Sequence, residues 1–331
     1  MGIVEEYENS FEYVRRIILA NTAISAPLTF ITMFLIVFKS PKHMQTYKFL
    51  LLNISIWAFL TDMLLEVYML PLPLMEEFTV YITGIGRWFG STMTLLSLIG
   101  TAFCMGQYLI SLQLAFFYRY KSLKTNFEIC GTKLTNWHYT TGIAFLLIVP
   151  ATSMTISMIF VHVSDQELRN RLQKDHPELL PFLELPQTFG FDRIGISTLC
   201  SIVFLWVLLW IVSVFFCIKG IVKQFREHRN RLTDYTYKLH MQLFKALAIQ
   251  TAAPLTLFAI PLTVFVPSLV FQLRFIDEAF QMTLMTMSLH STVNSLAVLL
   301  LMKPYRDELR RIFRKITLRT NIVSSSFSNP S

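Results

Sequence analysis

The sequence predicts an all-α membrane protein: a seven-transmembrane helix bundle followed by a short amphipathic helix in the membrane interface. Three observations predict this fold class. Of the 331 residues, 53% are hydrophobic and only 15% are charged, whereas soluble globular domains carry about 25% charged residues. Seven separate stretches are apolar enough to cross a bilayer. Basic residues are concentrated in alternate connections between these stretches, as expected for a chain that crosses a membrane repeatedly.

Each of the seven stretches supplies the roughly 20 apolar residues that a helix needs to cross a hydrocarbon core of ~30 Å. The fifth is the clearest, because it contains no charged residue. The second is the least clean, because it contains Asp62 and Glu66 and is followed by two prolines. The predicted spans are Ile17–Phe38, Tyr47–Leu70, Phe89–Phe116, Trp137–Val161, Ile194–Ile218, Met241–Val266 and Gln281–Met302.

The distribution of Lys and Arg predicts the orientation of the chain. With the amino terminus outside, the cytoplasmic segments hold 21 of the 29 basic residues and the outer segments hold eight. Cytoplasmic loops are the ones enriched in basic residues. We therefore expect residues 1–16 outside, the bundle at 17–302, and the remaining residues in the cytoplasm. The net charge of +8 then reflects contacts with anionic lipids and cytoplasmic partners, and no nucleic-acid partner is expected.

The segment after the seventh span predicts an interfacial helix at residues 303–318. Pro304 suits the first turn of this helix, because the missing amide hydrogen has no partner there in any case. The apolar side is expected in lipid and the basic side toward phosphates. Residues 319–331 are rich in serine and predict a disordered tail. The apolar residues that recur at i, i+3, i+4 and i+7 are Leu309, Ile312, Phe313 and Ile316.

Arg119 is predicted at the inner end of the third span, between Tyr118 and Tyr120. Its guanidinium could extend to the interface as an anchor, or it could reach across the bundle toward the sixth span and hold the two helices together. The sixth span contains Pro254 and Pro261, and each proline removes one backbone hydrogen bond. A helix weakened in this way is suited to a segment that moves.

The polar residues inside the spans are candidates for function, because ionisable side chains are costly at that depth. Asp62 and Glu66 are four residues apart and share one helix face. At ~1.5 Å per residue, Asp62 and His290 lie about 22 and 18 Å from the inner boundary. We predict a seam between the second and seventh spans. It serves packing, state switching or ligand contact, with Glu66 best placed for a ligand. The seam comprises Asn53, Asp62, His290, Ser291 and Asn294.

Four motifs, in order along the chain, carry a resemblance to a known family. They are FKSPK with YKFLLLN at residues 38–53, YRY at 118–120, LFKALAIQ followed by a proline at 243–254, and KPYR at 303–306. Together they resemble the nematode serpentine chemoreceptors, a superfamily that includes serpentine receptor classes d, h, i and str.

The resemblance implies a G-protein-coupled receptor in the plasma membrane, found mostly on sensory cilia, that serves olfaction. Its expected partners are an odorant or pheromone-like small molecule, a heterotrimeric G protein and membrane lipids. We expect no cofactor, metal or enzymatic activity. The expected ligand contacts are Glu66, Asp62 and His290. G-protein coupling is expected from Arg119, Tyr118, Tyr120 and Lys245. Activation or packing is expected from Asn53, Asn294, Pro254, Pro304, Tyr305 and Arg306.

The sequence departs from rhodopsin-like receptors at several positions. Tyr118 replaces the acid that commonly precedes the arginine of the third helix, and Ser295, not proline, follows Asn294. The four cysteines have neither metal-ligand spacing nor a position suited to joining two outer loops, so we expect free thiols. They are Cys104, Cys130, Cys200 and Cys217.

The sequence also bears on three alternatives to a receptor. A transporter often shows two similar halves with matching broken helices, and this sequence shows no such internal symmetry. An intramembrane enzyme is disfavoured, because no two of the seven histidines share a buried helix face. An opsin is disfavoured, because the seventh span has no lysine for a Schiff base. Trp206 and Trp210, four residues apart on the fifth span, are interpreted as packing residues.

Overall fold

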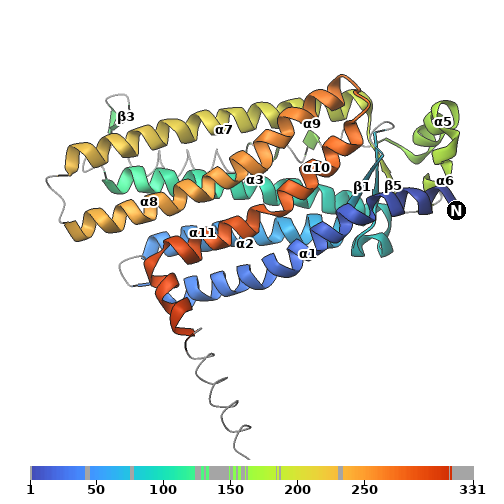
Figure 1. The fold of residues 1–331 in the computed structure, drawn as a ribbon. Coiled ribbons are helices and arrows are strands. Elements are labelled where there is room, and N and C mark those ends of the chain that lie inside the picture. The colour runs from blue at the N-terminus through green and yellow to red at the C-terminus, as the bar shows by residue number, and fades with distance from the viewer. Residues whose placement is uncertain are drawn as a thin grey trace, which may run out of the picture.

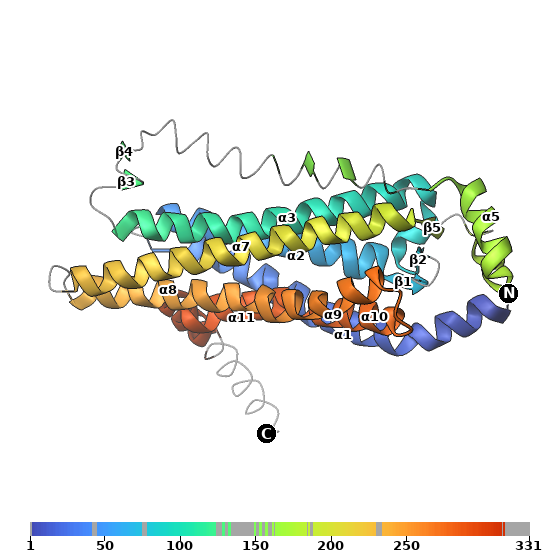
Figure 2. The same cartoon turned by 90° about the horizontal axis from the view of Figure 1, so that it is seen from above.

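The structure is a computed structural model of the 331-residue chain. It describes residues 2–41, 45–74, 78–123, 128–129, 132–133, 149, 152–153, 156–157, 161, 163–183, 185, 188–229, 234–312 and 314. Within these ranges, six helices are long and apolar enough to cross a membrane. They lie side by side in an elongated bundle (Figures 1 and 2). The fourth predicted span, Trp137–Val161, lies almost entirely outside the described residues, as does the predicted tail.

Three of the predicted spans are found as longer helices, α1 (Gly2–Lys39), α3 (Gly90–Leu123) and α7 (Arg193–His228). The second span begins with α2 (Gln45–Asp62), which is shorter than predicted. The first differs most, because the helix begins at Gly2 and the span had been expected to begin at Ile17. Phe11 and Val14 of this extension are buried, so burial of apolar side chains accounts for the extra turns.

The second, sixth and seventh spans are interrupted. After α2 the chain continues as a π-helical segment η2 (Met63–Met69), which ends at Leu70 in the left-handed conformation with φ of 41°. The sixth span has a π-helical segment between Pro254 and Pro261, and Pro261 lacks the amide hydrogen that a regular turn would direct to the Leu257 carbonyl in this segment. Its parts are α8 (Asp234–Pro254), η6 (Leu255–Ala259) and α9 (Ile260–Val270). The seventh consists of α10 (Ile276–Ser288) and α11 (His290–Leu301).

The bundle end that carries the amino terminus is covered by a small α/β layer that the sequence did not predict. We call it the cap. Its sheet has the order β1-β2-β5 with antiparallel pairs. Pro71 and Pro73 lie in β1, which is an edge strand, where a proline leaves no ladder hydrogen bond unmade. The cap elements are β1 (Pro71–Leu74), β2 (Thr79–Ile82), β5 (Thr188–Gly190), η4 (Ile85–Trp88), α5 (Asp165–Asp175), η5 (Pro177–Leu179) and α6 (Leu180–Leu183).

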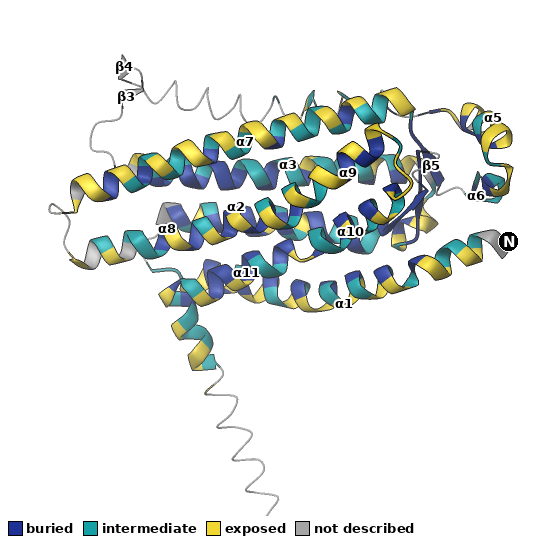
Figure 3. Ribbon diagram, turned by 45° about the horizontal axis from the view of Figure 1, so that its top comes forward, coloured by how far each residue is buried: buried dark blue, intermediate teal, exposed yellow. Residues whose placement is uncertain are grey.

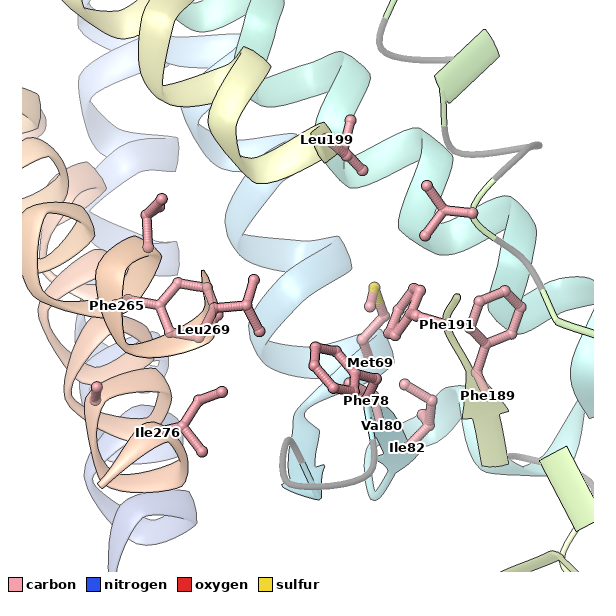
Figure 4. Packing of buried hydrophobic residues seen from close by; sticks show 13 residues of the cluster. Met69, Phe78, Val80, Ile82, Phe189, Phe191, Leu199, Phe265, Leu269 and Ile276 are labelled. Carbon is pink, nitrogen blue, oxygen red and sulfur yellow. The ribbon is translucent and has the colours of Figure 1, made fainter. Parts of the chain in front are cut away.

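Two apolar clusters join the cap to the bundle. One lies beneath the sheet and includes Phe78, Val80 and Phe189 with Phe265 and Leu269 of α9; Phe78 lies on the side toward α9, and Phe189 on the far side (Figure 4). The other lies between the sheet, α5, α6 and the extension of α1, with Tyr7 and Tyr81 packed edge-on against the ring of Phe182. The sheet therefore closes this end of the bundle with a continuous apolar core.

The opposite end has no comparable layer within the described residues. A short hairpin of β3 (Glu128–Ile129) and β4 (Thr132–Lys133) lies there, and residues 303–312 form a helix that turns away from α11 (Figure 1). We call this the arginine end, because Arg119 is buried there. Along the bundle, the outward faces of α7 and α9 are exposed (Figure 3) and include many large apolar side chains. A helix that is apolar on its exposed face suits a lipid environment.

Candidate functional site

A buried polar network connects α1, the second span and the seventh span. Asn21 donates a hydrogen bond to the Ser288 carbonyl and accepts one from Thr292 at 3.2 Å. Thr29 lies 3.1 Å from the Ser291 hydroxyl and 2.9 Å from that of Ser295. Polar side chains that bond across helices hold transmembrane bundles together. The network therefore fixes α1 against both halves of the seventh span.

Asp62, Glu66 and His290 form an acidic cluster at the centre of this network, with 1%, 2% and 3% of their surfaces exposed. His290 Nδ1 lies 3.3 Å from Asp62 Oδ1 and 2.7 Å from the Met287 carbonyl oxygen. Glu66 Oε2 lies 2.5 Å from the Thr22 hydroxyl. These contacts place Asp62 and His290, two members of the predicted seam, beside each other, with Glu66 one helical turn from Asp62.

The predicted seam is not continuous. Asp62, His290 and Ser291 lie together, but Asn53 faces α3. There, its side-chain amide donates to the Ser111 hydroxyl at 2.5 Å. Asn294 faces α8, accepting a hydrogen bond of 2.8 Å from Gln250. Counting residues from the inner boundary estimates the depth of each side chain in the membrane, but it does not indicate which neighbouring helix that side chain contacts.

Arg119 lies at the arginine end with only 4% of its surface exposed. Its guanidinium stacks over the ring of Tyr47 at 3.9 Å from the centroid, and Nη1 is 3.4 Å from Nδ1 of His240. Tyr118 stacks on Tyr47 in turn, with 6.5 Å between ring centroids. Arg119 of α3 therefore contacts the beginning of α2 and the sixth span at once. A side chain extended to the interface would instead be exposed.

The other residues expected at this end are distributed around the arginine. Tyr120 packs tightly on Gly220 of α7, where an added Cβ would come within 2.8 Å of the ring. Lys245 is exposed and does not join the arginine contacts. Arg306 donates to the Leu300 carbonyl at 3.1 Å.

Tyr305 connects the helix of residues 303–312 to the end of α1. Its hydroxyl and that of Ser40 are 2.7 Å apart. Burial raises the pKa of Tyr305, and the hydrogen bond with Ser40 opposes that shift. The phenol is therefore neutral at physiological pH and serves as a hydrogen-bonding group that positions the short helix.

An apolar hollow of about 180 Å³ lies between α3 and α7. Trp206 and Trp210 both line it, and Trp210 donates to the Leu109 carbonyl at 3.0 Å. Gln113 and Ser213, 2.9 Å apart, supply polar groups at one side. The structure thus places both tryptophans at a hollow, beyond the packing role interpreted from sequence. Among the described residues, no group of three or more His, Cys, Asp or Glu could hold a metal ion.

Several residues of both sites were missed from sequence. Tyr47 and His240 contact Arg119 from other helices, and no spacing within one helix indicates such partners. Thr22 could have been found, because a polar stripe recurs along α1 at i, i+3, i+7 and i+10. The stripe comprises Thr22, Ser25, Thr29 and Thr32, all buried.

Comparisons with known proteins agree with this arrangement. The crystal structure of squid rhodopsin matches with a TM-score of 0.61 at 14% sequence identity, covering 93% of this chain and 86% of that chain. At this identity the likeness concerns the fold alone. No curated protein sequence matches. The family model described as serpentine type 7TM GPCR chemoreceptor Srh matches residues 9–315. The predicted resemblance and fold class are confirmed, and the chain belongs to the Srh family of serpentine seven-transmembrane G-protein-coupled chemoreceptors.

Proposed function

We propose that this multi-pass membrane protein is a chemosensory receptor that detects an external odorant or pheromone-like molecule and signals to a cytoplasmic heterotrimeric G protein. Family membership supports the receptor class. The observation that carries the coupling is the burial of Arg119 between Tyr47 and His240, which ties three helices at one end of the bundle. A charged group held at such a junction can be released when the helices separate.

In this proposal the receptor lies in the plasma membrane of a sensory cilium. The cap is outside the cell and the arginine end faces the cytoplasm. The excess of Lys and Arg in the segments at the arginine end supports that orientation. The helix at 303–312 supports it too, because its basic side chains would lie at the level of anionic headgroups. Its apolar Leu309 and Ile312 pack against the bundle core at this end.

The resting state depends on contacts of modest strength. A cation–π contact is worth about 0.5–2 kcal/mol, depending on how far the pair is removed from water. Neither of the two positions directly before Arg119 holds an acid, because they are occupied by Phe117 and Tyr118. The proposed latch is therefore aromatic, with His240 of the sixth span beside it, and we expect measurable activity without ligand.

The ligand signal is proposed to pass from the cap to the arginine end through the seventh span. The acidic cluster lies beneath the cap, and Asn294 of α11 bonds to Gln250 of α8 one turn farther along the seventh span. Tyr47 at the start of α2 completes the route, since the same helix carries Asp62. Because Glu66, Asp62 and His290 are almost fully buried, a ligand can contact them only after the cap moves.

The experiment is a functional screen in cultured cells. The receptor, tagged at both ends, is expressed with a promiscuous G protein and exposed to a panel of small volatile and pheromone-like molecules. Second-messenger output is divided by surface-receptor number. We expect the amino-terminal tag to be reached by antibody in intact cells, the carboxyl-terminal tag only after permeabilisation, and output above that of vector-only cells. A reversed tag pattern, or output equal to that of vector-only cells with and without every compound, would contradict the proposal.

A further inference from the structure

Glu66 lies in a cluster that is rich in hydrogen-bond acceptors and poor in donors. Its Oε2 contacts the Thr22 hydroxyl of α1 at 2.5 Å, and the same hydroxyl lies 2.9 Å from the Ile18 carbonyl oxygen. A threonine hydroxyl has one hydrogen to donate, and a carbonyl oxygen can only accept. Both contacts are satisfied at once when Thr22 donates to Ile18 and Glu66, as a carboxylic acid, donates to Thr22.

The titratable groups around Glu66 also indicate that it carries a proton. Among the described residues, the titratable groups that face the cluster are Asp62 from α2, His290 from the seventh span and Tyr108 from α3, whose ring lies 5.3 Å from that of His290. On α1 the neighbour is Thr22, which does not titrate. Asp62 and Glu66 interact directly, and two neighbouring carboxyl groups in a dry site share one proton, because both cannot ionise.

His290 does not supply the missing donor. Its Nδ1 is directed at the Met287 carbonyl oxygen at 2.7 Å, leaving a longer contact of 3.3 Å with Asp62 Oδ1. Asp62 meets the Ser291 hydroxyl and Glu66, but among the described residues neither of its buried carboxyl oxygens has a hydrogen bond of ordinary geometry. A buried carboxylate that is so weakly paired is expensive. A proton shared by Asp62 and Glu66 removes that cost, and the described side chains around the pair offer no permanent positive charge in its place.

The cluster is connected directly to the cap. Glu66 lies in the π-helical segment η2, which ends at Leu70 with a positive φ, and β1 begins at the next residue. The Leu70 carbonyl accepts a hydrogen bond of 2.6 Å from the Thr83 hydroxyl, which follows β2. π-Helical turns inside helices are frequent at functional sites, and a bulky residue with positive φ is an uncommon conformation. A change at Glu66 therefore reaches the sheet through a few residues of strained backbone.

We propose that Asp62 and Glu66 form a proton-binding site in which Glu66 is the carboxylic acid, and that the proton leaves when the cap opens. In the closed form the proton removes the cost of a second buried charge. In an open form water solvates the carboxylate, so the proton passes to water. Because the closed form binds one proton more, rising pH favours the open form, by up to tenfold per pH unit. Acid outside the cell would therefore hold the cap closed.

Infrared spectroscopy of the purified full-length receptor in lipid nanodiscs tests the assignment of the proton. At neutral pH we expect the carbonyl band of a protonated carboxylic acid, shifted in heavy water. Glu66→Gln should abolish this band and Asp62→Asn should keep it. Thr22→Val, which has nearly the same shape but cannot accept a hydrogen bond, should move the band to higher frequency. A missing band, an unmoved band in Thr22→Val, or a band lost only in Asp62→Asn would overturn the proposal.

Hydrogen exchange of the cap amides in β2 and β5 tests the coupling. After correction for intrinsic exchange, we expect the open population of the wild type to rise between pH 6 and pH 8. Glu66→Gln should remove that dependence. The matched control is Glu178→Gln, which changes an exposed cap carboxylate paired with His176 and should leave the dependence intact. Equal slopes in wild type and Glu66→Gln would refute the coupling. Neither measurement needs a ligand or a G protein, so its outcome is separate from that of the functional screen.

Discussion

The two ends of the bundle are closed by different kinds of interaction. At the cap, a three-stranded sheet and short helices bury apolar side chains in two clusters against α1, α9 and α10. At the arginine end, an apolar cluster that includes Tyr47 and Tyr305 belongs to the bundle itself, and the contact between α3, α2 and α8 is one guanidinium on one tyrosine ring beside one histidine. The cap thus depends on many apolar contacts that act together, and the Arg119 junction depends on a few contacts that can be exchanged individually.

The difference in energy is large enough to assign different roles. Removing a buried aromatic side chain costs about 3–5 kcal/mol, whereas a cation–π contact contributes about 0.5–2 kcal/mol. The cap should therefore open rarely, and only with strong help from a ligand or from loss of the Glu66 proton. The arginine end should exchange between states readily. This contrast suits a receptor in which specificity lies at one end and signalling at the other.

The largest effect is expected from Phe182→Ala in the cap. Phe182 is 0% exposed and its ring is packed by Tyr7 and Tyr81. Truncation leaves a cavity that costs about 3–5 kcal/mol, and hydrogen exchange in β2 and β5 should accelerate by a factor of at least ~100. The control is Phe271→Ala, because that side chain is 73% exposed. Equal exchange in the two variants would show that the cap core does not hold the sheet.

Arg119→Ala should abolish second-messenger output while surface expression stays near the wild-type level. The substitution removes the charge that lies between Tyr47 and His240. Because the position is near the end of α3, the bundle should remain folded. Arg119→Lys should restore part of the output, because lysine keeps the charge but lacks the planar fork that stacks on a ring. Output per surface receptor is the measurement. Signalling by Arg119→Ala at the wild-type level would reduce this residue to a packing element.

Tyr47→Leu should raise output without ligand by about fivefold, the equivalent of losing ~1 kcal/mol of cation–π attraction in the resting state. Tyr47→Phe keeps an aromatic face under the guanidinium at the observed distance of 3.9 Å and is the matched control, with output close to the wild type. The comparison is made at equal surface density in the absence of ligand. If both variants raise output equally, the ring face is not what holds Arg119.

The sequence predicted the long helices well and the cap not at all, for a physical reason. A membrane span is indicated by some 20 consecutive apolar residues, which is a strong local signal. The cap strands have four, four and three residues, and β1 contains two prolines. Such strands exist only because they bury both faces against distant segments, and that information is not local. The extension of α1 was not predicted for the same reason, since its apolar residues gain burial from the cap strands, α5, α6 and α10.

The two functional clusters were predictable to different extents. Asp62 and His290 could be brought together by counting depth along helices, because the membrane fixes a common axis, and Glu66 was related to Asp62 by its spacing of four residues on one helix face. The partners of Arg119 could not, because the rotation of each helix decides whether Tyr47 or another side chain of α2 meets the guanidinium. The sequence did indicate that Arg119 has no acid directly before it. It therefore indicated that any partner of Arg119 had to come from another helix or from aromatic rings.

The smallest effect is expected from Lys39→Gln at the arginine end. Lys39 Nζ lies 3.0 Å from Glu308 Oε1, and the two side chains are 39% and 16% exposed. Exposed ion pairs contribute about 0.2–1 kcal/mol, and Arg311, 3.6 Å from the other Glu308 oxygen, partly replaces the lost charge. A double-mutant cycle with Glu308→Gln, measured by thermal unfolding in nanodiscs, should give a coupling energy near ~0.5 kcal/mol. This coupling energy should fall as salt rises from ~0.1 to ~1 M, because the Debye length falls from about 10 to 3 Å. Tyr305→Phe, which removes the buried contact with Ser40, should cost more, about 1 kcal/mol. A coupling above ~2 kcal/mol that persists in salt would mean that this end is held as firmly as the cap, and the contrast between the two ends would fail.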